Sequence, residues 1–202
     1  MLNSVHRILA GLILVFVIVH LSNHVVAIFG VQAHIDFMEV ARSVYRNVFV
    51  EILLLVSLVV QLSIGLFFVY RSWNKRTGFF QRIQAISGCY LVFFLIAHVG
   101  AVLNGRSELN LDTNFYFAVA GIHIGNLAYY FIPYYFLAVA AIFVHVACAA
   151  NWMLKSRDVV IANKISIFIM VVGVVIAILI TLLLAGVFYP IEVPDEYRIM
   201  FG

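Results

Sequence analysis

The chain has 202 residues, of which 65% are hydrophobic and only 10% are charged, and its formal net charge is +3. This composition excludes a soluble domain and indicates a membrane protein. The length suits a single transmembrane domain over residues 1–202 and leaves no room for an additional folded catalytic domain. The positive charge is spread over the connections between apolar segments, which argues against nucleic-acid binding and against an acidic substrate.

Five apolar segments follow one another, and each reaches the length of about 20 residues that a helix needs to cross a bilayer. We expect transmembrane helices over residues 8–29, 48–70, 83–103, 127–154 and 165–187. The first segment lacks the cleavage pattern of a signal peptide, so we expect it to be retained. The connections around residues 31–47 and 104–126 are long enough for short surface helices, although the second has the turn-rich composition of a loop.

The distribution of basic residues predicts the orientation of the helices. The N-terminal flank and the connections 71–82 and 155–164 hold eight of the twelve Lys and Arg residues. Nearly all the acidic residues fall on the opposite side. The positive-inside rule therefore places the N-terminus in the cytoplasm and the C-terminus outside.

Four histidines lie inside the apolar segments: His20, His24, His98 and His145. An imidazole in hydrocarbon must hydrogen-bond to a neighbour, carry a proton at high cost or bind a metal. At 1.5 Å per residue, His20 lies ~18 Å and His98 ~22 Å from the cytoplasmic ends of their predicted helices. His145 and Gln61 share a lower level, each ~14 Å from its own end.

Two imidazoles at one depth on facing helices suit the two axial positions of a b-type haem. Zinc would need three or four converging ligands, which the sequence does not supply at that level. His24, one turn outward of His20, is an alternative ligand, a partner for a haem propionate or a polar group near the interface. We expect His34 and His123 to be solvated in the outer connections and His6 to lie at the inner interface.

Three segments carry a resemblance to a known family: VIVHLSNHVV, QRIQAISGCYLVFFLIAH and AAIFVHVACAANW. They resemble the membrane-anchor cytochrome b subunits of succinate:quinone oxidoreductases and fumarate reductases, in the single-chain, five-helix, dihaem type. The resemblance implies an all-α membrane protein with a haem-binding four-helix bundle and a peripheral fifth helix. In that family helices one and three hold one haem, and helices two and four hold the other. The matching ligand positions are His20, His98 and His145, with Gln81, Arg82 and Gly88 completing the third-helix pattern.

The second helix departs from the family pattern, because Gln61 occupies the ligand position, while Glu51 and Gly65 fit. An amide is a poor haem ligand compared with an imidazole. We therefore expect one low-spin haem b, with His20 and His98 as the ligands of its iron. For His145 two possibilities stay open: a five-coordinate second haem, or a bare side chain that bonds to Gln61.

Polar groups at the two membrane interfaces suggest further contacts. A quinone carbonyl needs a hydrogen-bond donor in an apolar cleft, and the candidates at the cytoplasmic ends of helices one and three are Arg7, Ser87 and Arg82. Topogenic charge and snorkelling are the alternative explanation for the arginines. On the outer side, the candidates for propionate contacts are His24, Arg42, Arg46 and Arg106, of which Arg46 and Arg106 lie nearest the membrane.

The resemblance implies a haem b anchor that passes electrons between a peripheral iron-sulfur subunit and membrane quinone. A flavoprotein would be the further partner on the cytoplasmic face of a bacterial inner membrane. The sequence shows no nucleophile, catalytic dyad or phosphate loop, so we expect no reaction on a soluble substrate by this chain alone. The alternatives are a structural or accessory subunit of another membrane electron-transfer complex, which has lost some or all of its haem, and a stand-alone quinol-linked cytochrome.

Overall fold

The computed structural model describes residues 1–124 and 127–201, and within these ranges the chain is helical without a strand. Five of its helices are long and apolar enough to cross a membrane. They are α1 (Leu2–Val26), α3 (Val48–Ser72), α4 (Phe79–Ser107), α6 (Ala128–Leu154) and α7 (Val159–Leu184). The predicted all-helical fold class is thereby confirmed, together with five helices that have the length and apolar composition of the predicted spans.

Several helices begin outside the apolar stretch that predicted them. α1 begins at Leu2 and α4 at Phe79, because backbone hydrogen bonding continues through the polar residues that flank an apolar segment. α7 begins earlier than predicted because the Asp158 side chain accepts hydrogen bonds from the backbone N–H groups of Val160 and Ile161, at 2.8 and 2.9 Å. Such a cap satisfies donors that the first helical turn leaves without a partner.

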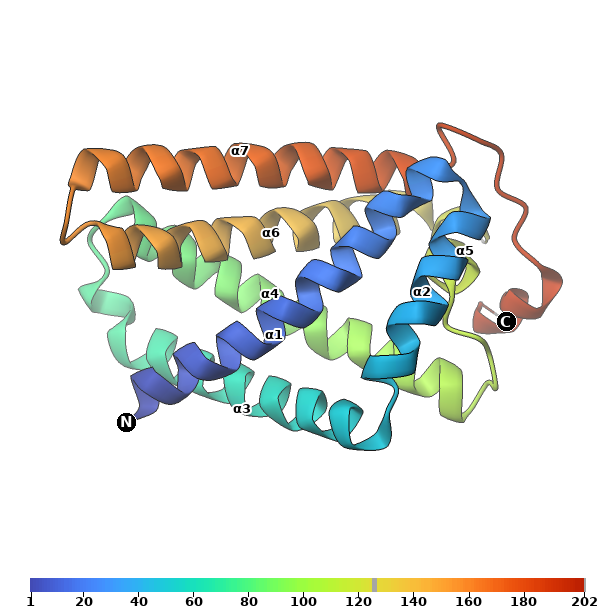
Figure 1. Cartoon of the computed structure of the whole chain (residues 1–202), viewed down its shortest axis with the longest axis horizontal. Helices are drawn as coiled ribbons and strands as arrows, with labels where there is room; N and C mark the ends of the chain where they lie inside the picture. The colour runs from blue at the N-terminus through green and yellow to red at the C-terminus, as the bar shows by residue number, and fades with distance from the viewer. Residues whose placement is uncertain (125–126, 202) are drawn as a thin grey trace. The chain divides into compact units, whose positions relative to one another are not determined.

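The chain divides into two compact units. The first unit, Met1–Ser72, contains α1, the short 3-10 helix η1 (Ala27–Phe29), α2 (Val31–Tyr45) and α3. The chain turns between α1 and α2 at Gly30, whose φ of 112° favours glycine. Figure 1 shows α2 folding back beside the end of α1, so the first long connection forms a short helix, as predicted.

The second unit, Trp73–Gly202, contains η2 (Trp73–Lys75), α4, α5 (Phe115–His123), α6, α7 and η3 (Asp195–Met200). α7 returns along α6 after the short connection 155–158 (Figure 1). Their approach is close, because a Cβ atom at Gly173 would overlap with Cβ of Phe143. The Asn151 amide also donates to Asn163 Oδ1 across this interface at 2.8 Å. Small side chains and interhelical hydrogen bonds are the usual means of packing helices in lipid.

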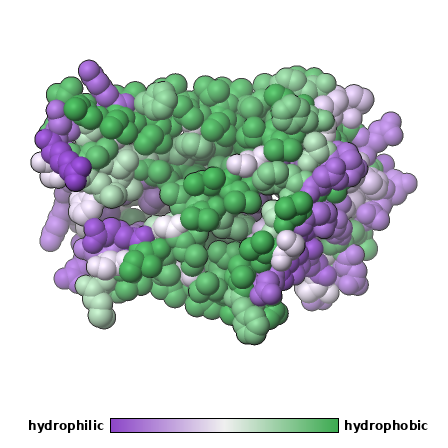
Figure 2. All heavy atoms as spheres, viewed as in Figure 1, coloured by the Kyte–Doolittle hydropathy of each residue, from purple (hydrophilic) through white to green (hydrophobic). Residues whose placement is uncertain are grey.

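The outer surface of the spans is apolar, as contact with lipid requires. On α7, Phe168 is 68% exposed and Val175 59% exposed. Figure 2 shows hydrophobic residues covering the length of α7, with hydrophilic residues beyond its ends. These features identify an integral membrane protein.

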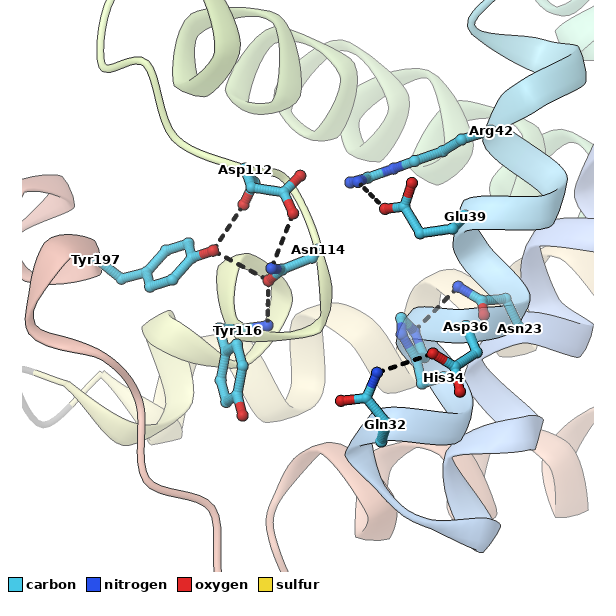
Figure 3. Close-up of polar contacts among 10 residues, drawn as sticks. All are labelled: Asn23, Gln32, His34, Asp36, Glu39, Arg42, Asp112, Asn114, Tyr116 and Tyr197. Carbon is cyan, nitrogen blue, oxygen red and sulfur yellow. Dashed lines mark hydrogen bonds and ion pairs between the residues drawn. The ribbon is translucent and has the colours of Figure 1, made fainter.

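The C-terminal segment closes the end of the second unit that holds α5 (Figure 3). Tyr197 is fully buried, and its hydroxyl donates to the Asp112 carbonyl at 2.9 Å and to Asn114 Oδ1 at 3.0 Å. Asn114 in turn caps α5 by accepting the backbone N–H of Tyr116. His123 is exposed, as predicted, but its Nε2 donates to the Leu184 carbonyl at 2.9 Å and so ties α5 to the end of α7.

Candidate functional site

His20 and His98 have the same local setting on two different helices. On α1 the His20 ring stacks on Phe16, with ring centroids 5.6 Å apart and planes 14° apart. On α4 the His98 ring stacks on Phe94, at 5.1 Å and 13°. Residues four apart lie above one another on a helix face, so each phenylalanine holds the plane of its histidine ring. The repeated Phe-x-x-x-His spacing is visible in the sequence, and the sequence reasoning missed it.

The two histidines also lie at matching positions along their own helices. Measured from the observed first residues, Leu2 and Phe79, His20 lies ~27 Å along α1 and His98 ~28 Å along α4. These two distances differ by less than do the ~18 Å and ~22 Å obtained from the predicted helix ends. That the two rings share a level in the membrane stays a prediction.

His34 is buried rather than solvated, which corrects the sequence prediction. It is 2% exposed and lies on α2, where His34, Met38 and Arg42 form a buried stripe at a spacing of four residues. The sequence prediction was wrong because it treated the connection as solvated and did not identify the inward face of a helix. Burial, followed by electrostatic effects of His20 and of the Arg42 guanidinium, lowers the pKa of His34 from 6.5 to about 4. His34 is therefore neutral near pH 7.

A chain of polar contacts joins His34 to the end of α1. Nε2 of His34 lies 3.1 Å from Nδ2 of Asn23 and 3.4 Å from Nδ1 of His24 (Figure 3 draws the first contact). An amide nitrogen only donates, so Nε2 of His34 accepts from Asn23, and Nδ1 of His24 lies at the edge of hydrogen-bond distance from the same nitrogen. The His24 ring then packs edge-on against His20, with centroids 4.8 Å apart. His24 is thus a direct neighbour of the predicted ligand His20.

Arg42 is the most buried of the three arginines considered for propionate contacts. It is 7% exposed, and its Nη1 donates to Oε1 of Glu39 at 2.8 Å (Figure 3). Arg46, at the C-terminal end of α2, and Arg106, in the last turn of α4, are only partly buried. The Glu39 carboxylate supplies the anion that a buried cation needs, and a contact of Arg42 with a haem propionate stays a prediction.

In the second unit, His145 on α6 bonds to the backbone of α4. Its Nδ1 lies 3.2 Å from the Gln84 carbonyl and 3.3 Å from Oγ of Ser87. A carbonyl only accepts, so Nδ1 carries the proton and Nε2 carries the lone pair. A Cβ atom at Gly88 would lie 3.1 Å from Cε1 of His145, so this glycine provides space for the ring. The predicted family positions Gly88 and His145 are therefore direct neighbours.

The candidate quinone donors bond mainly to nearby backbone carbonyls. Ser87 donates to the Gln84 carbonyl at 3.1 Å. Nε of Arg7 donates to the Asn3 carbonyl at 3.3 Å, and Nε of Arg82 donates to the Arg76 carbonyl at 3.0 Å. Both arginine side chains are exposed. The role of these residues in quinone binding stays a prediction.

Gln61 has a partner that the sequence did not indicate. Its Nε2 lies 3.4 Å from Nε2 of His6, which joins α3 to the beginning of α1 inside the first unit. The two residues are 55 positions apart, and no local pattern connects them. The residue at the predicted ligand position of the second helix thus takes part in a hydrogen bond between helices.

No family model, no curated protein and no solved structure matches the chain. Over the residues that the structure describes, the fold and the candidate site define a helical integral membrane protein with five potential spans and histidines inside three of them.

Proposed function

We propose that the chain is the haem b membrane anchor of a complex similar to succinate:quinone oxidoreductase or fumarate reductase. In this role it passes electrons between a peripheral iron-sulfur subunit and membrane quinone. The observation that carries the proposal is the pair of equivalent histidines, His20 and His98, each stacked on a phenylalanine one turn before it.

The residues fit the requirements of a six-coordinate haem. Such a haem needs two neutral imidazoles with fixed ring planes in an apolar environment. His20 and His98 would hold its iron, since both lie within apolar spans and both are held by an aromatic ring. When bound, haem would supply reversible transfer of one electron. His24, Arg42, Arg46 and Arg106 are the proposed partners of its propionates.

A second haem is not part of the proposal. His145 has the protonated Nδ1 and the backbone acceptor that metal-ligating histidines commonly have. Gln61, however, replaces the other ligand that the family resemblance requires, and its amide bonds to His6. We therefore assign His145 a structural role between α4 and α6.

The proposed complex has its partners on the basic side of the membrane. With the N-terminus in the cytoplasm, the short connections after α3 and α6 carry most of the Lys and Arg residues toward the iron-sulfur and flavoprotein subunits. The membrane would be the bacterial inner membrane. Any reaction of succinate or fumarate belongs to those subunits and not to this chain.

The test is a visible difference spectrum of the purified full chain, recorded before and after addition of a short-chain naphthoquinol. We expect a low-spin b-type signal at about one haem per chain, reduced by the quinol. Dithionite gives the total amount of reducible haem as the control. If gentle purification yields a folded chain without haem, the chain is an accessory subunit, which is the alternative that the Gln61–His6 bond favours.

A further inference from the structure

The His6–Gln61 pair leaves two buried polar atoms unsatisfied. Among the described residues, Nδ1 of His6 and Oε1 of Gln61 have no hydrogen-bond partner although both atoms are buried. Leaving such an atom without a partner costs about 1–3 kcal/mol. Two of them on adjacent side chains require an explanation, and a bound molecule that pairs with both atoms supplies one.

The chemistry of the pair fixes what that ligand must offer. An amide nitrogen only donates, so Gln61 donates to Nε2 of His6, and the neutral His6 ring carries its proton on Nδ1. The pair then retains one donor, Nδ1–H, and one acceptor, Oε1. If the amide is rotated by 180°, the two side chains exchange roles, but the pair still retains a donor and an acceptor. The ligand must therefore accept one hydrogen bond and be able to donate another.

The surroundings of the pair are apolar and suit a flat ring. A Cβ atom at Gly65 would lie 3.6 Å from Cε1 of His6, and the Phe68 ring meets the His6 ring edge-on at 5.5 Å. Gln61 lies ~16 Å from the end of α3 at Ser72, inside the apolar span. Both residues are partly exposed, so the pair lies near the surface of the first unit, but its two unsatisfied atoms are covered. A ligand reaches these atoms only after the side chains rotate. A ligand there must be soluble in the membrane.

We propose that His6 and Gln61 bind the head group of membrane quinone. The quinone carbonyl accepts the hydrogen bond of the donor, and the hydroxyl of the reduced form donates to the acceptor. This inference rests on the proposed function, which requires a quinone site. It places that site on α1 and α3 instead of at Arg7, Ser87 and Arg82, whose polar atoms bond to backbone carbonyls.

The test measures binding of 2,3-dimethyl-1,4-naphthoquinone to the purified full chain by equilibrium dialysis against empty detergent micelles. We expect His6→Phe to raise the Kd of the quinone about tenfold, because it removes the donor to the quinone carbonyl. Gln61→Leu should raise the Kd of the reduced form, the naphthoquinol, about tenfold in the same dialysis under anaerobic dithionite, because it removes the acceptor of the quinol hydroxyl. The control is Ser63→Ala, also on α3, whose hydroxyl is exposed and donates to the Val59 carbonyl. This control should leave the Kd unchanged.

A second measurement does not depend on the stability of a variant. In the unsubstituted chain, hydrogen bonding should lower the infrared C=O stretching frequency of the bound quinone relative to quinone in empty micelles. An unshifted band, or equal Kd values for all three variants and the unsubstituted chain, would overturn the inference and would mean that the pair holds only water.

Haem content is determined on the same samples. If haem is present but quinone binding does not depend on His6 and Gln61, only this inference fails. If haem is absent from the unsubstituted chain, the proposed function fails, whatever the quinone result.

Discussion

Substitution of Gly88 by alanine tests the contact between α4 and His145. The added Cβ atom would lie 3.1 Å from Cε1 and 3.4 Å from Nδ1 of His145, while carbon atoms pack best at about 3.5–4.0 Å. The ring must therefore move away from α4 by about 0.4 Å or more. The Nδ1 bond to the Gln84 carbonyl, now 3.2 Å, would then exceed hydrogen-bond length, because Gln84 lies on the same helix as Gly88.

Two effects of the Gly88→Ala substitution oppose each other. Alanine stabilises a helix interior by about 0.8–1.0 kcal/mol relative to glycine. Loss of the buried bond, with the carbonyl and ring left poorly paired, costs about 2 kcal/mol. Gly100→Ala is the matched control on α4, since a Cβ atom there would meet nothing within 4 Å. We expect Gly100→Ala to be neutral or stabilising and Gly88→Ala to be less stable than this control by about 2 kcal/mol.

The assay is equilibrium unfolding of both variants by SDS in mixed micelles, followed by circular dichroism. Helix propensity cancels between the two variants, so their difference reports the His145 contact. If their unfolding free energies agree within about 0.5 kcal/mol, the contact does not hold His145 in place and the reasoning is refuted.

Three further predictions concern other parts of the chain. The pKa of His34 is lowered to about 4 in the folded chain, so between pH 6.5 and pH 4 His34 takes up a proton in the unfolded chain but not in the folded one. The free energy of unfolding should therefore decrease by up to about 3 kcal/mol over this range. Unfolding titrations across this range should show a much weaker dependence in His34→Gln, and an unchanged dependence would contradict the role of burial. Tyr197→Phe removes the donor to the Asp112 carbonyl and should lower the free energy of unfolding by about 1–2 kcal/mol. It should also speed amide hydrogen exchange around residues 109–116. The control Tyr129→Phe, at an exposed position, should change neither quantity. Gln61→His restores the family ligand and should raise the haem content from about one to about two per chain, and a pyridine haemochrome assay that still finds one would refute the proposed equivalence of this position.

Hydropathy was sufficient to predict the helical class and five helices long enough to cross a membrane, because the length of an apolar segment is set directly by the bilayer. The helix ends were less accurate, since they depend on local capping such as that by Asp158. α2 was expected as a possible short helix, but its buried face was not. That face depends on contact with α1, which places His34 beside Asn23 and His24.

The candidate residues illustrate the same limit. The histidines inside apolar segments stand out in the sequence because an imidazole is unusual there. The Phe-x-x-x-His spacing around His20 and His98 was also readable, but its meaning depends on ring geometry. The pairing of Gln61 with His6 and of His145 with the Gln84 carbonyl arises from contacts between helices far apart in sequence, which no local pattern encodes.

The most direct test of the central claim is haem per chain in four single variants, His20→Ala, His98→Ala, His24→Ala and His145→Ala, measured beside the unsubstituted protein. We expect His20→Ala and His98→Ala to lose the low-spin signal, and His24→Ala and His145→Ala to retain about one haem per chain. Retention of the signal in either His20→Ala or His98→Ala, with the fold intact by circular dichroism, would contradict the proposed ligand pair.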